Sequence, residues 1–243
     1  MTVLGDRASR PPLGEAVMRA FLIVPADSGA IAAAMASDAH ALIVDMTGLA
    51  SPAFFPERRP GVPLFYLRSH DLERDLPAMM AAAPHGIVLP RCEGARDVMR
   101  LGARLAVEEA MQGLTDGATR ILAFIETARG ALALHTLADA GERLVGIAWD
   151  AAAVRIEIGA PTIRDREGVL RPSLAQVRAL VRLTAAAARV TAIDTPCLPG
   201  GDLAGEVEAA RDDGFEAKLI LEPDQAGFVR EFSFRSPASS AES

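Results

Sequence analysis

Two carboxylates stand at the ends of neighbouring apolar runs. Glu126 follows the run Ile121–Ile125, and Asp150 follows the run Leu144–Trp149. Short apolar runs without alternation are typical of strands that are buried on both faces. Acids at the ends of two such strands could share one divalent cation, because Mg²⁺ takes oxygen ligands and often uses only one or two protein carboxylates. The alternative is that each acid caps the helix that follows it.

Eight such runs alternate with mostly Ala-rich helical patterns along the chain. The runs are Ala20–Pro25, Ala41–Met46, Val62–Arg68, Gly86–Pro90, Arg120–Glu126, Leu144–Asp150, Val190–Thr195 and Ala217–Glu222. The expected helices are Ser28–Ser37, Ala95–Ala110, Thr127–Ala140, Leu174–Arg189, Leu203–Asp213 and Asp224–Phe232. Eight buried strands alternating with helices predict an α/β protein with a (β/α)₈ TIM barrel. A doubly wound sheet is the runner-up, but it would not require eight strands.

Charged residues gather at the ends of these runs. They are Asp45, Arg68, Arg91, Glu126, Asp150, Asp194 and Glu222. A TIM barrel places its active site at the carboxyl ends of its strands, so these residues are expected to converge there. They exceed what helix capping needs, which predicts a chemical site on this rim. The alternative is an internal ion-pair network among the first four of them.

Several short motifs between residues 19 and 232 carry a family resemblance. They are Arg19–Pro25, Leu64–Arg68, Leu89–Glu93, Ile125–Gly130, Ala192–Thr195 and Gly214–Ile220. On these motifs the chain resembles the citrate lyase beta-subunit branch of the HpcH/HpaI aldolase/citrate lyase family. Members of that family are TIM barrels that cleave or form carbon–carbon bonds next to a carbonyl. Many act on coenzyme A thioesters, use Mg²⁺, and assemble as trimers or hexamers.

The resemblance implies a carbon–carbon lyase that depends on Mg²⁺ or Mn²⁺ and acts on an acyl-CoA or keto-acid substrate. It implies that Glu126 and Asp150 hold the metal and that Arg68 holds a substrate carboxylate or carbonyl oxygen. Such cleavage develops negative charge on an enolate oxygen, which a divalent cation can stabilise. A guanidinium suits a carboxylate because its donors form a fixed fork. The resemblance also implies a homo-oligomer, with a trimer favoured.

The chain departs from the family pattern at several rim positions. Thr47 and Gly48 stand where relatives carry acids, Glu222 stands where they carry histidine, and Trp149 replaces an acid before the metal aspartate. Glu222 and Asp45 are therefore the remaining candidates for general base.

The substrate pocket needs basic groups if the ligand is an anionic CoA thioester. Arg91 and Arg19 are the expected substrate-binding residues beside Arg68. The departures from the family pattern leave a second hypothesis open, a diverged non-catalytic barrel that serves as a ligand-binding or assembly subunit. A salt bridge between Glu126 and Arg68 that fills the pocket would favour this second hypothesis.

The chain is expected to form one domain. Residues 19–232 would form the barrel, residues 1–18 an N-terminal extension, and residues 233–243 a disordered tail rich in Ser, Ala and Pro. Four prolines between positions 52 and 63 leave no room for a normal helix, so the second helix of the barrel is expected to be lost or vestigial.

Composition bounds the partners. With 243 residues and 50% hydrophobic content, the chain can bury a large core. The net charge of −7 argues against nucleic acid as a partner. Two cysteines cannot form a disulfide framework, which indicates the reducing cytoplasm. No apolar run approaches 18 residues, so no membrane span is expected.

Overall fold

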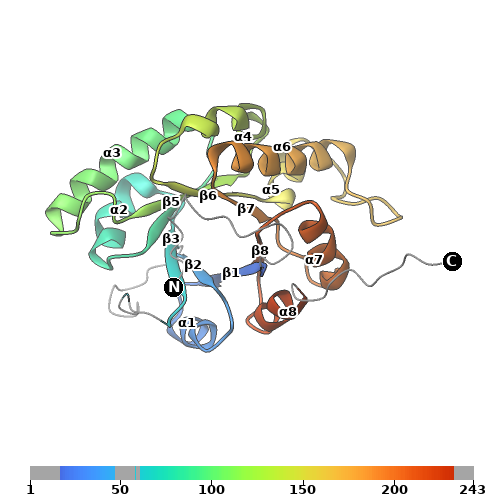
Figure 1. Ribbon diagram of the computed structural model, residues 1–243, viewed down its shortest axis with the longest axis horizontal. Coiled ribbons are helices and arrows are strands. Elements are labelled where there is room, and N and C mark those ends of the chain that lie inside the picture. The colour runs from blue at the N-terminus through green and yellow to red at the C-terminus, as the bar shows by residue number, and fades with distance from the viewer. Residues whose placement is uncertain (1–16, 47–57, 59–60, 233–243) are drawn as a thin grey trace.

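Eight parallel strands pair in chain order and close on themselves, with β8 next to β1. The structure, a computed structural model, describes residues 17–46, 58 and 61–232. The strands are β1 (Arg19–Pro25), β2 (Ala41–Asp45), β3 (Leu64–Arg68), β4 (Gly86–Leu89), β5 (Arg120–Ile125), β6 (Leu144–Trp149), β7 (Thr191–Asp194) and β8 (Ala217–Ile220). The predicted TIM barrel is confirmed (Figure 1).

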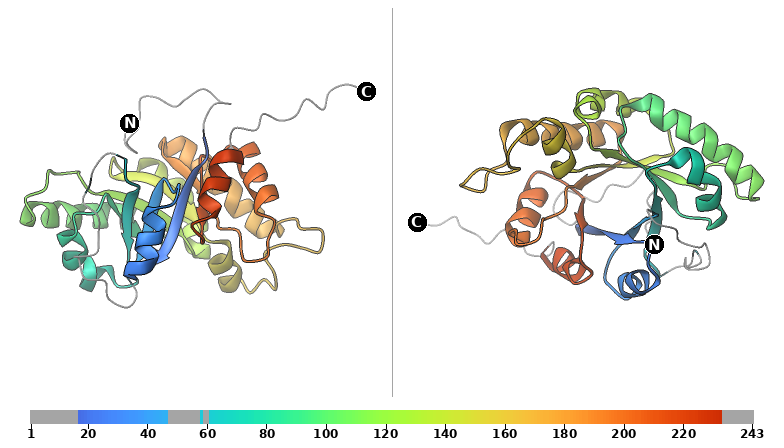
Figure 2. Two further views of the ribbon diagram at one scale, coloured as in Figure 1. Left: turned by 90° about the horizontal axis from the view of Figure 1, so that it is seen from below. Right: turned by 180° about the vertical axis from the view of Figure 1, so that it is seen from behind.

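Helices surround the strands, as the view from behind shows (Figure 2). They are α1 (Ser28–Met35), α2 (Leu72–Ala81), α3 (Ala95–Met111), α4 (Ala128–Ala133), α5 (Ala151–Glu157), α6 (Pro172–Ala188), α7 (Leu203–Asp212) and α8 (Gln225–Phe232). A 3₁₀ turn, η2 (Leu134–Asp139), continues α4. Two of these helices, α2 and α5, are absent from the sequence prediction. The predicted loss of a helix between β2 and β3 concerns residues 47–60, which lie almost entirely outside the described residues, and so do both predicted ends of the chain.

Aspartates and a threonine fix where several helices begin. The side chains of Asp27, Asp71, Thr127, Asp150 and Asp202 each accept a hydrogen bond from an amide in the first turn of the helix that follows. Such caps satisfy amides that have no partner inside the helix. The chain therefore turns sharply from strand to helix at the ends of β1, β5 and β6.

Alternate strand residues divide the core into two layers. One layer fills the barrel and includes Ile43, Tyr66, Phe124 and Ala148, all at most 1% exposed. The other lies between the sheet and the helices, and Trp149 belongs to it. Because successive side chains on a strand face opposite sides, the parity of a strand-end residue decides whether it points into the barrel mouth.

Candidate active site

Four of the predicted residues share the parity of the barrel interior. Asp45, Arg68, Glu126 and Asp150 each lie two positions beyond an interior residue of the same strand. Asp45 and Arg68 are in register on β2 and β3. Ile125 and Trp149 are in register on β5 and β6, so Glu126 and Asp150 follow side by side. The carboxyl end of the barrel thus brings three acids and one arginine to the same mouth.

Arg68 and Glu126 form an ion pair within this mouth. Arg68 Nη2 lies 2.6 Å from Glu126 Oε1, and the two side chains are 14% and 6% exposed. The guanidinium carbon lies 5.6 Å from the centroid of the Phe124 ring, a cation–π contact below the pair. The Nε of Arg68 is buried and has no hydrogen-bond partner among the described residues. A buried guanidinium donor without a partner is costly, so this atom is suited to receive a ligand oxygen or a water.

The second oxygen of Glu126 is held by backbone. The amide of Arg91 donates to Glu126 Oε2 at 2.6 Å. Arg91 has φ of 47°, a left-handed conformation that is uncommon for residues other than glycine. Its side chain is exposed, so the contact of Arg91 with Glu126 is made through its amide. Of the four-residue ion-pair network considered from the sequence, the described contacts show the Arg68–Glu126 pair, which Arg91 joins through its backbone amide and not through its charge.

Asp150 caps α5 and also borders Glu126. Its Oδ1 accepts hydrogen bonds from the amides of Ala152 and Ala153, at 2.8 and 3.0 Å. Its own amide donates to Ile125 O at 3.0 Å, which ties Asp150 to the end of β5. The Oδ2 atom accepts no hydrogen bond from the described residues. The capping interpretation is confirmed for Asp150, and it uses only one of the two carboxylate oxygens.

Glu126 does not cap α4, because Thr127 does. Thr127 Oγ1 accepts from the amide of Gly130 at 2.9 Å. Position 130 requires glycine, since a Cβ there would lie 2.4 Å from the carbonyl oxygen of Cys92. This close approach brings the turn after β4 against the start of α4. The Glu-Thr-Ala-Arg-Gly motif therefore leaves the Glu126 carboxylate free to face the barrel mouth.

The pair of neighbouring acids suits a hard cation in part. Asp150 offers Oδ2, which accepts no hydrogen bond from the described residues, whereas both oxygens of Glu126 are engaged, so Arg68 would have to share or yield Oε1. No group of three or more His, Cys, Asp or Glu side chains among the described residues could hold a metal. Two carboxylates can hold Mg²⁺, which commonly completes its coordination with water and substrate oxygens. They are too few for an ion that is held by protein ligands alone, such as structural Zn²⁺.

Two further predicted residues lie at the carboxyl end with fewer described contacts. Asp45 is half-buried at the end of β2, and its carbonyl accepts from the amide of Ala26. Glu222 is exposed beyond β8, where its amide donates to Gln225 Oε1 at 3.3 Å. The described hydrogen bonds and ion pairs do not join Glu222 to Arg68 or Glu126.

Arg19 lies at the other end of the barrel. It opens β1, and its Nη2 donates to Thr191 Oγ1, at the start of β7, at 3.0 Å. Burial lowers the pKa of Arg19, with Glu216 acting in the opposite sense. The structure does not bring Arg19 to the rim, because the first residue of a strand lies a strand length from its carboxyl end. We therefore leave it out of the site.

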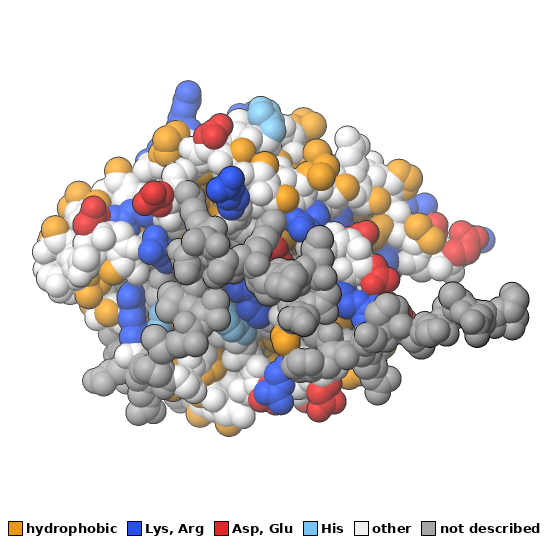
Figure 3. All heavy atoms as spheres, viewed as in Figure 1, with side chains coloured by type: hydrophobic (Ala, Val, Ile, Leu, Met, Phe, Trp, Pro, Cys, Tyr) orange, Lys and Arg blue, Asp and Glu red, His pale blue; other side chains and the backbone are white. Residues whose placement is uncertain are grey.

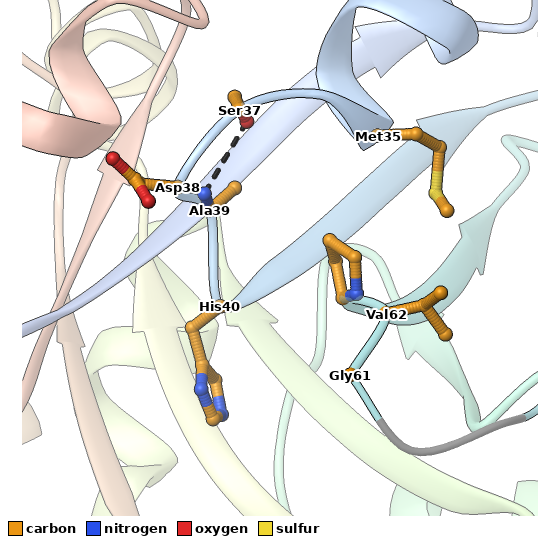
Figure 4. A pocket seen from close by; sticks show the side chains of 8 residues that line it. Met35, Ser37, Asp38, Ala39, His40, Gly61 and Val62 are labelled. Atoms are coloured by element: carbon orange, nitrogen blue, oxygen red, sulfur yellow. Dashed lines mark hydrogen bonds between the residues drawn. The ribbon is translucent and has the colours of Figure 1, made fainter.

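A surface hollow also lies at the amino end of the strands. It is lined by residues that precede β2 and β3, among them Ser37, Asp38, His40, Gly61 and Val62 (Figure 4). Ser37 Oγ accepts from the amide of Ala39 at 3.3 Å within it. None of the rim residues lines this hollow, so it does not contribute to the candidate active site.

Asp194 has the opposite parity and faces the helices. Its Oδ1 accepts from Trp149 Nε1 at 2.8 Å and from Arg178 Nε at 3.2 Å. Lys218 is fully buried beside it, with Nζ 3.8 Å from Asp194 Oδ2 and 3.1 Å from Glu206 Oε2. The expectation that Asp194 belongs to the rim is therefore corrected. A lysine inside an apolar strand was the signal for this network, because a buried lysine needs a carboxylate nearby.

Comparisons with known proteins agree with this architecture. A family model described as HpcH/HpaI aldolase/citrate lyase matches residues 29–223. A citrate lyase subunit beta-like protein of Mycobacterium tuberculosis is 31% identical over 163 residues, 66% of this chain and 54% of that protein. Citrate lyase subunit beta of Haemophilus influenzae is 29% identical over 154 residues, 62% of this chain and 51% of that protein. The chain thus spans about half the length of the curated relatives it matches.

Solved structures extend the likeness over most of the fold. The citrate lyase beta subunit of Mycobacterium tuberculosis complexed with oxaloacetate and magnesium has a TM-score of 0.70 at 26% identity, covering 90% of this chain and 98% of that chain. CitE of the same organism in complex with magnesium, acetoacetate and coenzyme A has a TM-score of 0.70 at 27% identity, covering 91% and 82%. No helix among the described residues is both long and apolar enough to cross a membrane.

Proposed function

Because the chain belongs to the HpcH/HpaI aldolase/citrate lyase family, we propose that it is a divalent-metal-dependent carbon–carbon lyase acting on an acyl-CoA or keto-acid substrate. The observation that carries this proposal is the convergence of Arg68, Glu126 and Asp150 at the carboxyl mouth of the barrel. A TIM barrel builds its chemistry at this end. The same barrel fold supports many different activities, so the proposal rests on the residues of the site and not on the fold alone.

Arg68 is the proposed substrate-binding group. Its Nε has no partner among the described residues and can donate to a second acceptor beyond Glu126, and a substrate carboxylate or carbonyl oxygen has the required lone pairs. The Phe124 ring beneath the guanidinium limits its movement, which favours one orientation of the bound oxygen. We propose that the exposed guanidinium of Arg91 adds charge at the edge of the same mouth.

Glu126 and Asp150 are the residues that would hold Mg²⁺ or Mn²⁺. When bound, the cation would supply Lewis-acid stabilisation of negative charge on the substrate oxygen. The two solved structures from Mycobacterium tuberculosis that hold magnesium, one with oxaloacetate and one with acetoacetate and coenzyme A, support this choice of cation and substrate class. Asp150 would contribute the oxygen that does not cap α5, and Glu126 would have to give up or share its contact with Arg68.

Asp45 and Glu222 are the proposed proton-transfer groups. Cleavage of a carbon–carbon bond next to a carbonyl requires removal of a proton from the hydroxyl that becomes the new carbonyl. Asp45 lies in register with Arg68, which supports a role for it beside the proposed substrate oxygen. Glu222 lies on the same end of the barrel after β8 and is the alternative.

A non-catalytic barrel is the second candidate function. The Arg68–Glu126 ion pair favours it, because this pair occupies one of the two proposed metal ligands. The absence of acids at positions 47 and 48 favours it as well. In this case the mouth would bind a small ligand or assemble with a partner without turnover.

A substrate panel separates the two candidates. Wild type, Asp45→Asn and Glu222→Gln are assayed with Mg²⁺ on 3-hydroxyacyl-CoA thioesters and 2-keto-3-hydroxy acids. Loss of the general base lowers turnover by about 10²–10⁴-fold, so one of the two variants is expected to show that loss. The matched variant Thr47→Glu/Gly48→Asp restores the missing acids. Activity in the restored variant but not in wild type would refute the lyase proposal.

We also propose that the chain self-associates, with a trimer favoured. Apolar side chains lie over α4 and α6 in the space-filling view (Figure 3), where Leu132 is 79% and Leu183 66% exposed. The outer face of α3 adds Met99, Val107 and Met111 at intervals of four or eight positions. Exposed apolar side chains grouped in this way are typical of an interface. Light scattering that gives the 25.6 kDa mass of one chain at tens of micromolar would contradict this proposal.

A further inference from the structure

Both neighbours of Asp150 are tied to the end of β7. The indole Nε1 of Trp149 donates to Asp194 Oδ1 at 2.8 Å. The amide of Ala151 donates to Thr195 Oγ1 at 3.0 Å. Both hydrogen bonds are buried, and they hold the chain immediately before and immediately after the carboxylate.

These two hydrogen bonds connect β6 and β7 beyond the point where their backbone pairing ends. Backbone pairing between β6 and β7 reaches Ala148 and Ile193 and stops there. Beyond that point the side chains of Asp194 and Thr195 continue the attachment. On its other side Asp150 is joined to β5, through its amide and the carbonyl of Ile125. The strand end that carries Asp150 is therefore fixed from both neighbouring strands.

The anchor residues are themselves held in place. Lys218 Nζ donates to the carbonyl of Thr195 at 2.8 Å and lies 3.1 Å from Glu206 Oε2. Arg178 Nε lies 3.2 Å from Asp194 Oδ1. Lys218 is fully buried, and the exposed fractions of the Arg178 and Asp194 side chains are 12% and 4%. A network with this many partners gives Trp149 and Ala151 a rigid surface to bind.

We infer that Trp149, Asp194 and Thr195 are positioning residues that set the orientation of the Asp150 carboxylate toward the barrel mouth. The inference rests on the proposed function, in which Asp150 holds the cation. Groups that orient a metal-binding side chain commonly change metal affinity by about 10–100-fold when they are removed. With two protein ligands, the orientation of each one decides a large share of that affinity.

Thr195→Val is the informative variant. Valine keeps the shape of the side chain and removes the acceptor for the Ala151 amide. Thr195→Ser retains the hydroxyl and serves as the conservative rescue. Thr191→Val is the matched control, because Thr191 is a buried threonine at the start of β7, the strand that Thr195 follows, and its hydroxyl accepts from Arg19 at the opposite end of the barrel. Trp149→Phe tests the second anchor independently of Thr195.

Two measurements read the position of Asp150. The first is Mn²⁺ affinity by electron paramagnetic resonance. The second uses metal-free protein and follows hydrogen exchange at the amides of Ala152 and Ala153, which donate to Asp150 Oδ1. As a check on wild type that the ion binds near Asp150, Mn²⁺ should broaden the indole N–H NMR signal of Trp149, which is assignable because Trp149 is the single tryptophan of the chain.

Thr195→Val and Trp149→Phe are expected to weaken Mn²⁺ binding about tenfold or more and to speed exchange at both amides. Thr195→Ser and Thr191→Val are expected to match wild type in both measurements. Wild-type affinity and wild-type exchange in Thr195→Val and Trp149→Phe would overturn the inference. If wild type itself binds no Mn²⁺, the proposed function fails, while the exchange result still decides whether these residues position Asp150.

Discussion

Two glutamate–arginine pairs occupy opposite ends of the barrel and differ in how completely they are satisfied. Glu126 and Arg68 meet at the carboxyl end through one contact of 2.6 Å. Glu109, in α3, meets Arg143 at the amino end through two, with Nη1 at 3.0 Å and Nη2 at 2.8 Å. Glu109 also accepts from the amides that precede β5, at 2.9 Å from Gly117 and 2.6 Å from Thr119.

The difference suggests separate roles: the Glu109–Arg143 pair stabilises the fold, and the Arg68–Glu126 pair keeps a donor that can bind a ligand. At the amino end every oxygen of Glu109 is engaged twice, and Arg143 also binds Asp116 at 2.6 Å. This arrangement joins α3 to the residues that immediately precede β5 and β6. At the carboxyl end, within the part of the chain that the structure describes, Arg68 Nε has no hydrogen-bond partner. A carboxylate with both oxygens doubly hydrogen-bonded at one end, and an arginine with a spare donor at the other, is the division expected when stability and ligand binding are built on separate faces.

The largest effect on stability is expected from Glu109→Gln. The amide would leave Arg143 without its buried charge partner and would turn one acceptor into a donor facing backbone N–H groups. Removing one member of a buried ion pair costs about 3–5 kcal/mol. Urea unfolding monitored by circular dichroism measures the change in free energy of unfolding. A loss below about 1 kcal/mol would remove the distinction between the two ends.

In Glu109→Gln the free energy of unfolding should also depend less on pH in the acid range than it does in wild type. Burial opposes ionisation of Glu109, but hydrogen bonds from Arg143 and from the Thr119 and Gly117 amides outweigh it and lower its pKa. A carboxyl whose pKa is lowered on folding stabilises the fold above its unfolded pKa, and this contribution is lost as the pH falls through the folded value. The gap between wild type and Glu109→Gln should therefore be largest near pH 7 and narrow below about pH 4. A gap that stays constant to pH 3 would contradict this assignment.

A smaller effect on stability is expected from Glu126→Gln. Asp45 and Asp150 share the mouth with Glu126, so mutual repulsion of the carboxylates offsets part of its attraction to Arg68. We expect the free energy of unfolding to change by about 1 kcal/mol or less in either direction. Mn²⁺ binding should weaken, because one proposed ligand is lost. Calorimetry that finds equal Mn²⁺ affinity in both proteins would remove Glu126 from the metal site.

The strands and most helices could be predicted from the sequence because their patterns are local. Apolar runs located β1 to β8 within a few residues at each end. Helix α2 was missed although Asp71 caps it and Leu76, Met79 and Met80 form its buried face, because Pro77 lies inside it. Helix α5 was missed because its seven residues are too few for a clear period.

The site could be predicted only as a set of strand ends. Strands buried on both faces show no alternation, so the sequence does not reveal which residue of each end faces inward. Asp45 and Asp194 look alike in sequence, yet one faces the mouth and the other binds Trp149 and Arg178 behind the sheet. No pattern in the sequence pointed to Thr195, because its side chain contributes by accepting one hydrogen bond from a backbone amide.

At the left-handed turn, Arg91 contacts Glu126 through its backbone amide and not through its side chain. Glu126 binds the amide of this residue, and every amino acid except proline supplies that amide. The guanidinium itself points to solvent and makes no demand on the carboxylate. The side chain at position 91, and with it the charge at this edge of the barrel mouth, can therefore change while the hydrogen bond to Glu126 persists. A substitution here would alter the charge beside the proposed active site and leave in place the contact that holds the Glu126 carboxylate.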